Sequence, residues 1–443
     1  MTAPDTFDAY RGDLLDLGAD PAADDGAVRF RPDGWLLVRG QRVAGVLDAD
    51  AEPDPRWRRH DWRGHLLLPG FVDTHVHAPQ LDVIASYGTE LLDWLQSYTF
   101  PAEARWADPA HARRSARRFV RELLAHGTTC AMVFPTVHRA GVDALFEAAV
   151  ELDMALLGGR VLMDRNCPDA LRDDARTAER ETVELIERWH GRGRCGYALT
   201  PRFAATSSAA QLELCGALLR AYDGVHLQTH LAENRAEVDW IRALFPDARS
   251  YLDVYARAGL LGPRSVFAHA IWLDADDRAQ LAASGSAVAF SPSSNLFLGS
   301  GLFDWAATAA AGVPVAIASD VGAGTSLCQL RSAADAYKVL ALQGQRLDAW
   351  RALHAITRGA ARTLRRDDLG HFDVGAWADF CVWSWSADSL QRHRVELARS
   401  LHERVFAWLM LADSRNLAAV HVAGRRVPLD APGFAGALAS DAA

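Results

Sequence analysis

The sequence predicts an α/β protein, a (β/α)8 barrel of the TIM type with a small β-sandwich domain formed by both chain ends. From residue 66 onward, eight apolar runs of strand length alternate with segments of helix length. Near-continuous apolar strands separated by helices indicate a parallel sheet that is covered on its outer face. Eight such units are typical of the barrel, which usually needs about 250 residues.

The eight predicted barrel strands are 66–74, 128–134, 155–163, 195–203, 225–231, 265–272, 287–291 and 313–319. The helices between them have readable ends. Asp108 is a favourable N-cap before Pro109, an apolar stripe follows, and Gly127 is a stop signal. Two further helices are predicted over 207–222 and 274–284.

Short strand-like segments stand at both ends of the chain, over 27–50, 371–385 and 419–427. Glycines and a Pro-Asp-Gly turn divide them, and residues 3–26 before them are acidic and weakly patterned. We therefore predict that residues 1–65 and 369–443 build one small β domain, and that residues 66–368 form the barrel.

Composition excludes several classes of function. The 443 residues carry a net charge of −9 without a long basic run, which argues against nucleic-acid and anionic-membrane partners. No apolar run approaches the roughly 20 residues that span a bilayer, and the first residues do not resemble a signal peptide. The six cysteines are scattered without a CxxC pair, so we expect no disulfide framework and a cytoplasmic location.

The stretch from Leu66 to Leu81 contains the first functional signal, His75 and His77. Residues two apart on a strand point to the same side, so both imidazoles would project from the end of the first barrel strand. With 16 histidines in the chain, one such pair could arise by chance. Further ligand-type residues at later strand ends strengthen the signal: these are His230, Glu233, His269 and Asp320.

Barrel active sites lie at the carboxyl ends of the strands, so these side chains are expected to meet there. His75, His77, His230 and Asp320 form a set of nitrogen and oxygen donors suited to a catalytic zinc ion. Such an ion lowers the pKa of a bound water towards about 7. Asp320 could take the proton, His269 could hydrogen-bond the water or polarise the group under attack, and Glu233 could pass a proton to the leaving group.

Sequence motifs along most of the chain resemble the amidohydrolase superfamily and, within it, the guanine deaminase family. The general motifs are PGFVDTHVH at 69–77, the histidine at 230, HA at 269–270 and SD at 319–320. The narrower ones are HAPQ at 77–80, LLDWLQSYTFPAE at 91–103, TPRF at 200–203, THLAEN at 229–234, SPSSNLFLGSG at 291–301 and SDVGAGTS at 319–326. The sequence departs from the family at Leu81, where an aromatic residue is common, and at Ser319, which is often threonine.

The resemblance implies zinc-dependent hydrolysis of the C2 amino group of guanine to xanthine and ammonia, a step of purine catabolism. It implies one zinc per chain, held by the four residues named above, with Glu233 and His269 beside the bound water. Gln80, Arg202 and Phe203 match the purine-binding residues, residues 94–106 match a lid, and a homodimer is expected. From the residues alone, a surface salt bridge for Arg202 and a core position for Phe203 are slightly favoured over purine binding.

Other functions remain open at this point. A sister hydrolase could act on another aminated or chlorinated heterocycle, such as 8-oxoguanine or a triazine, and a non-catalytic barrel could serve as a scaffold. The zinc nucleobase deaminases with a Pro-Cys-x-x-Cys signature are excluded, because that signature does not occur here.

Overall fold

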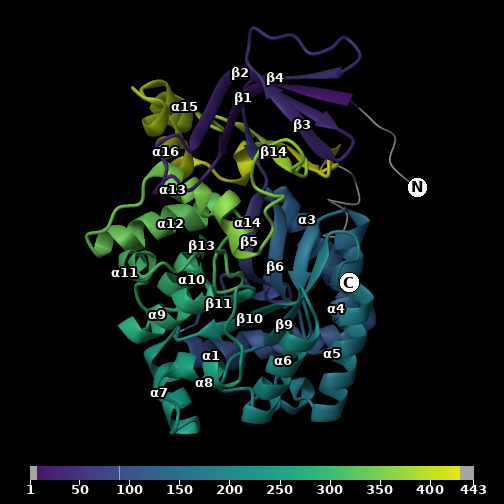
Figure 1. Ribbon diagram of the computed structural model, residues 1–443, viewed down its shortest axis with the longest axis vertical. Coiled ribbons are helices and arrows are strands. Elements are labelled where there is room, and N and C mark those ends of the chain that lie inside the picture. Colours follow the sequence, from purple (N-terminus) through teal and green to yellow (C-terminus); the bar gives the residue numbers. More distant parts are fainter. Residues whose placement is uncertain (1–6, 89, 430–443) are drawn as a thin grey trace.

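The computed structural model describes residues 7–88 and 90–429, and it consists of a barrel with a separate sheet at one end (Figure 1). Residues 1–6 and 430–443, which belong to the predicted small β domain, lie outside the described residues. The small sheet lies at the top of Figure 1, and the barrel lies below it.

Eight parallel strands form the barrel, as predicted. They are β5 (Phe71–His77), β6 (Thr128–Phe134), β7 (Ala155–Gly158), β9 (Cys195–Pro201), β10 (His226–Leu231), β11 (Ser265–His269), β12 (Ala287–Phe290) and β13 (Val315–Ile317). A short strand, β8 (Val161–Leu162), also pairs with β9. The ring closes just beyond β13, where the Asp320 N–H donates to the His75 carbonyl at 3.0 Å and the His77 N–H donates to the Val321 carbonyl at 2.9 Å.

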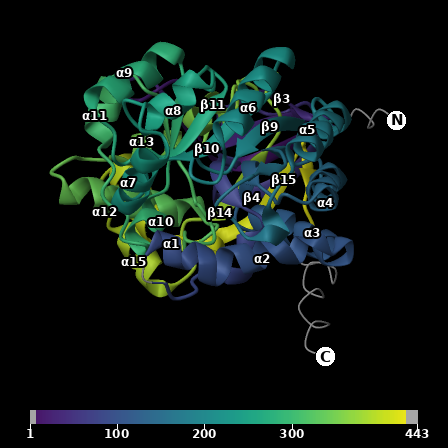
Figure 2. The same ribbon diagram turned by 90° about the horizontal axis from the view of Figure 1, so that it is seen from below.

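Helices cover the outside of the strands, and Figure 2 shows them arranged around the barrel. They are α3 (Pro109–Ala125), α4 (Arg139–Glu151), α5 (Ala175–Trp189), α6 (Ala209–Ala221), α7 (Arg235–Leu244), α8 (Tyr251–Arg257), α9 (Ala275–Ser284), α10 (Pro292–Phe297), α11 (Trp305–Ala310), α12 (Gln329–Leu342), α13 (Ala349–His354) and α14 (Arg358–Thr363), with a 3-10 turn η4 (Asp169–Leu171). Every residue of β5 and β6 is buried, which explains their continuous apolar sequence. Among the described helices, none is long and apolar enough to cross a membrane.

Helix α3 has the predicted ends and the predicted buried face. The Asp108 side chain accepts a hydrogen bond from the Ala110 N–H, and Gly127 has a left-handed backbone with φ 84° just after the helix. The buried residues are Ala112, Ala116, Phe119, Val120, Leu123 and Leu124. The helices over 207–222 and 274–284 are likewise confirmed as α6 and α9.

A chain of short helices joins β5 to α3 and lies over the carboxyl ends of the barrel strands. It comprises η1 (Pro79–Val83), α1 (Leu91–Trp94), the π-helical turn η2 (Leu95–Thr99), α2 (Phe100–Ala104) and η3 (Arg105–Ala107). Trp94 and Trp106 are almost completely buried and anchor this segment. We call residues 91–107 the covering segment.

The two chain ends form one sheet, in the order β16-β15-β14-β4-β1-β2-β3. Its strands are β1 (Phe7–Leu17), β2 (Val28–Arg39), β3 (Arg42–Leu47), β4 (Arg58–Pro69), β14 (Phe380–Ser384), β15 (Leu417–Val422) and β16 (Arg425–Arg426). All neighbours are antiparallel except β1 and β4. Two helices, α15 (Ser389–Glu396) and α16 (Leu401–Leu411), and the turn η5 (Ser414–Asn416) separate β14 from β15.

Two details differ from the prediction. Strand β1 lies in the segment that showed little pattern, because its residues alternate charged and apolar only in part. The first predicted barrel strand, 66–74, is divided between two sheets: Leu66, Leu67 and Leu68 belong to β4 and pair with β14, and the barrel strand begins at Phe71. Both sheets bury apolar residues, so composition alone does not reveal the change.

Gly70 is the residue at which the chain passes from the small sheet into the barrel. Its N–H donates to the Asp379 carbonyl at 3.0 Å, and a Cβ at this position would lie 2.1 Å from Thr129 Oγ1. The Asp379 side chain also forms a buried ion pair with Arg194, just before β9. The small sheet is thus fixed to the amino-terminal end of the barrel, opposite the covering segment.

We expect Gly70→Ala to lower the free energy of unfolding by about 1–3 kcal/mol, because the added methyl group overlaps Thr129. The measurement is chemical denaturation followed by circular dichroism. Gly262→Ala is the control, since the nearest atom to a Cβ there is Ser265 Oγ at 3.9 Å. Equal stability of the two variants would contradict the assignment of Gly70 as a packing constraint.

Candidate active site

A cavity lies at the carboxyl ends of the barrel strands, where (β/α)8 enzymes have their active sites. Of the residues predicted from the sequence, all except His75 line this cavity: His77, Gln80, Arg202, Phe203, His230, Glu233, His269 and Asp320. His75 is 2% exposed and contacts this group from within the barrel. Leu91, Trp94 and Leu95 of the covering segment line the cavity opposite the strands.

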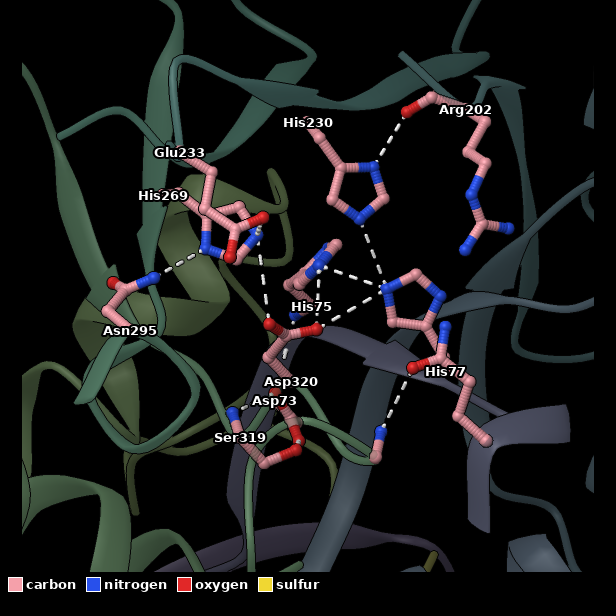
Figure 3. Close-up of polar contacts among 12 residues, drawn as sticks. Asp73, His75, His77, Arg202, His230, Glu233, His269, Asn295, Ser319 and Asp320 are labelled. Carbon is pink, nitrogen blue, oxygen red and sulfur yellow. Dashed lines mark hydrogen bonds and ion pairs between the residues drawn. The ribbon is translucent and has the colours of Figure 1, made fainter. Parts of the chain in front are cut away.

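Four of these side chains point their donor atoms at one another (Figure 3). Asp320 Oδ1 lies 3.2 Å from His75 Nε2 and 3.3 Å from His77 Nε2. His77 Nε2 in turn lies 3.3 Å from His75 Nε2 and 3.2 Å from His230 Nε2. Residues that are far apart in the sequence therefore meet at one point.

These separations fit a single metal ion. With metal–ligand bonds of about 2.0–2.1 Å, neighbouring donor atoms around a tetrahedral ion lie about 3.3–3.4 Å apart. Imidazole nitrogens and one carboxylate oxygen are also the donors that zinc prefers. The set His75, His77, His230 and Asp320 is thus suited to hold a divalent cation.

His269 lies close enough to join His75 and His230 in a second possible ligand group, so its tautomer matters. The Asn295 amide nitrogen donates to His269 Nδ1 at 2.8 Å, which places the ring proton on Nε2 and makes that atom a donor. His230 is the reverse, because its Nδ1 donates to the Arg202 carbonyl at 2.6 Å and leaves Nε2 with a free lone pair. His230 is thus suited to be a metal ligand, and His269 is suited to donate a hydrogen bond into the cavity.

Burial sets the charge of the cluster. It lowers the pKa of His77 and of His269 to about 3 and the pKa of His230 well below its ordinary value, so these imidazoles are neutral at pH 7. Burial alone would raise the pKa of Asp320, but His75 and its other imidazole neighbours outweigh this and hold that pKa well below its ordinary value. Neutral imidazoles beside one anionic carboxylate are in the state that binds a metal.

Backbone strain occurs at the same place. Asp320 and His269 both have left-handed backbone conformations, with φ of 49° and 68°, which residues other than glycine rarely adopt. The Asp320 carbonyl accepts from the Gly324 N–H at 2.6 Å, in addition to the bond from its own N–H to His75. Such strain persists only where the surroundings over-determine it, and it clusters at active sites.

Asp73 lies behind the ligands and ties the two ends of the barrel ring together. Its Oδ1 accepts from the N–H groups of His75 at 3.3 Å and Ser319 at 3.1 Å, and its Oδ2 accepts from the Ser319 hydroxyl. Burial raises the pKa of Asp73 to about 6. Asp73 therefore positions His75, a candidate ligand on β5, and Ser319, the residue before the candidate ligand Asp320.

Glu233 follows β10 and is held beside the ligand group without belonging to it. The Ser300 hydroxyl donates to Glu233 Oε1 at 2.9 Å, and Oε2 lies 3.4 Å from His269 Nε2. Burial, together with the nearby carboxylates of Asp320 and Glu237, raises the pKa of Glu233 well above its ordinary value. A carboxyl group in this environment is able to hold and release a proton near neutral pH.

The other side of the cavity offers hydrogen-bond donors and an aromatic ring. Gln80 Oε1 accepts from the Gly322 N–H at 3.3 Å, and within the described part of the chain the Gln80 amide nitrogen has no hydrogen-bond partner, so it can donate. Phe203 is buried with its ring edge-on to Trp240. Arg202 extends beside the rings of His230 and His77 (Figure 3), and it is only 2% exposed, so it is not a surface residue.

Four residues important for this geometry were not identified from the sequence: Asp73, Glu103, Asn295 and Ser300. All four occur within motifs that were recognised, but nothing in their spacing revealed which side chain each would contact. Glu103 forms an ion pair with Arg202 at 2.7 Å, and both side chains are almost completely buried. Glu103 is an acidic residue at the end of an aromatic-rich segment, as many surface residues are. The sequence therefore did not distinguish it from a surface residue.

A protein-family comparison matches residues 66–427 to the amidohydrolase family. The chain therefore belongs to the amidohydrolase family. Guanine deaminases are among the relatives that it resembles. The guanine deaminase of Escherichia coli (strain K12) is 43% identical over 434 residues, which cover 96% of this chain and 99% of the relative.

Solved structures give the same result. The structure of E. coli guanine deaminase matches with a TM-score of 0.92 and 42% identity, covering 95% of this chain and 99% of that one. Guanine deaminase from C. acetobutylicum with bound guanine in its active site matches with a TM-score of 0.87 and 25% identity, covering 95% of this chain and 100% of that one.

Replacing a ligand should remove the metal without unfolding the protein. We expect wild-type protein to contain about one divalent ion per chain, and His230→Gln to retain a small fraction of it, because one nitrogen donor is lost. Metal content is measured by inductively coupled plasma mass spectrometry. His226→Gln on the same strand is the control, since its Nε2 contacts the Leu364 carbonyl instead; equal losses in both variants would argue against this ligand set.

Proposed function

We propose that this protein is a guanine deaminase, which hydrolyses the C2 amino group of guanine to give xanthine and ammonia. The observation that carries this proposal is the cavity, which joins a candidate metal group to Arg202, Gln80 and Phe203. Similarity to guanine deaminases over nearly the whole chain supports it. A role in purine catabolism follows from the reaction.

His75, His77, His230 and Asp320 would hold the metal, and zinc is the ion that this donor set favours. When bound, the ion supplies acidity to a water molecule, with a pKa lowered towards about 7. The roles of the remaining residues follow from their positions around that point.

Asp320 and Glu233 would move the protons. Asp320 is anionic and its Oδ2 faces His269 at 3.7 Å, so it is placed to accept a proton from the attacking water. Glu233, fixed by Ser300, would carry a proton to the purine ring and to the departing amino nitrogen. The water oxygen remains on C2, the C2–N bond breaks, and the nitrogen leaves as ammonia. The His269 Nε2–H would donate to the oxygen that adds to C2.

Arg202, Gln80 and Phe203 would select guanine. The guanine ring presents O6 and N7 as acceptors, and Arg202 supplies fixed donors of matching geometry. Phe203 offers an apolar ring at the cavity wall. Adenine has an amino group at position 6, which cannot accept from Arg202, so a site built around this arginine discriminates against it.

Location and assembly are also part of the proposal. All six cysteines are free thiols, which is consistent with a reducing cytoplasm. A homodimer is expected from the family resemblance, and light scattering coupled to size-exclusion chromatography measures it. The partner of the site is a small purine.

Substitution of Glu233 tests the catalytic assignment. We expect Glu233→Gln to lower kcat for guanine by about 10²–10⁴-fold, because the amide cannot transfer a proton, while metal content stays unchanged. Loss of guanine absorbance on conversion to xanthine is the assay, and exposed Glu213→Gln on α6 is the control. If the metal-loaded wild type left guanine unchanged but hydrolysed 8-oxoguanine or a chlorinated triazine in a substrate panel, the assigned substrate would be wrong.

Substitution of Arg202 tests purine recognition. We expect Arg202→Ala to raise KM for guanine about 10–100-fold, through loss of a charged hydrogen bond, with a smaller change in kcat. Arg242→Ala, which breaks a surface pair with Asp239, should leave both constants unchanged. A normal KM in Arg202→Ala would show that this side chain does not hold the purine.

A further inference from the structure

We propose that Glu103 is a positioning residue that fixes the guanidinium group of Arg202 and thereby sets the selectivity of the site for purines with an oxygen at position 6. This inference rests on the proposed function. Glu103 lies on α2 in the covering segment, and it is separated from Arg202 by 99 residues.

The contact uses one end of the guanidinium group only. Arg202 Nη1 donates to both Glu103 oxygens, each at 2.7 Å. Among the described residues, Nε and Nη2 of Arg202 have no hydrogen-bond partner, while the Arg202 side chain lines the cavity. The carboxylate therefore holds one nitrogen and leaves the others available to an acceptor in the cavity.

The covering segment also restrains the plane of the guanidinium group. The ring of Phe100, one turn before Glu103, has its centroid 5.4 Å from Arg202 Cζ. A guanidinium group with a flexible side chain gains directional precision when a carboxylate and a ring face both restrain it. Glu103 is only 1% exposed, so water does not reach this ion pair. If the Glu103 carboxylate were removed, water could not take its place in stabilising the charge of Arg202.

We call the contacts of Glu103 and Phe100 with the Arg202 guanidinium group the clamp. The main chain of Arg202 connects the clamp to the candidate metal ligands. Its carbonyl accepts from the His230 Nδ1–H at 2.6 Å and from the Thr229 hydroxyl at 3.2 Å. The side chain of Arg202 is thus held by the covering segment, and its backbone carbonyl is hydrogen-bonded to residues of β10. A change at Glu103 should alter purine selection and leave metal binding intact.

The test compares two ligands that differ at position 6: hypoxanthine, which has the oxygen, and purine, which lacks it. Neither has the C2 amino group, so both are measured as competitive inhibitors of guanine turnover and by calorimetry. In the wild type, we expect hypoxanthine to bind at least about tenfold more tightly than purine. In Glu103→Gln this ratio should fall about tenfold, because the amide removes the charge that holds Nη1, while zinc content stays near wild type.

Glu103→Asp is a second variant, for use if Glu103→Gln fails to fold. It keeps the negative charge, so it should fold, but its shorter side chain should also lower the selectivity for hypoxanthine. Glu151→Gln is the matched control, since Glu151 pairs with Arg117 on the surface. The proposal is overturned if the wild type does not prefer hypoxanthine, if the ratio is unchanged in both Glu103 variants, or if both ligands weaken equally. A wild type that does not convert guanine would refute the proposed function, whereas the calorimetric ratios would still report on the clamp.

Discussion

The site depends on bringing three imidazoles and one carboxylate to a single point inside the barrel. Burial lowers the pKa of His77 and of His230, so these two rings are neutral, and the neighbouring imidazoles hold the pKa of Asp320 low, so its carboxylate keeps its charge. His77 Nε2 lies 3.2–3.3 Å from the Nε2 atoms of His75 and His230. Without a cation, there would be too few protons for a hydrogen bond at each of these contacts. The arrangement therefore makes physical sense as the shell of a metal ion.

The barrel maintains this arrangement at a cost in backbone strain. Asp320 and His269 are left-handed residues with side chains that favour other conformations. Ring closure between β5 and the residues after β13, together with the bonds that Asp73 makes to both sides, holds Asp320 in place. The hydrogen bond from Asn295 then makes His269 Nε2 a donor, and the hydrogen bond to the Arg202 carbonyl leaves His230 Nε2 with a lone pair that a metal ion could use.

Much of this could be predicted from the sequence, because strand-length apolar runs and ligand-type residues at their ends are local signals. His75, His77, His230, Glu233, His269 and Asp320 were found in this way, and the structure brings them together. Contacts between distant segments were not predictable. The pairing of Glu103 with Arg202 depends on how the covering segment folds over the barrel, and the division of 66–74 between two sheets depends on the close packing at Gly70.

The account depends on the coordination of one zinc ion by His75, His77, His230 and Asp320. X-ray absorption spectroscopy at the zinc edge on the purified protein tests it most directly. The account predicts nitrogen and oxygen neighbours at about 2.0–2.2 Å, with the outer-shell scattering of about three imidazole rings, which His230→Gln should reduce. Sulfur neighbours at about 2.3 Å, or a zinc environment without imidazole scattering, would contradict it.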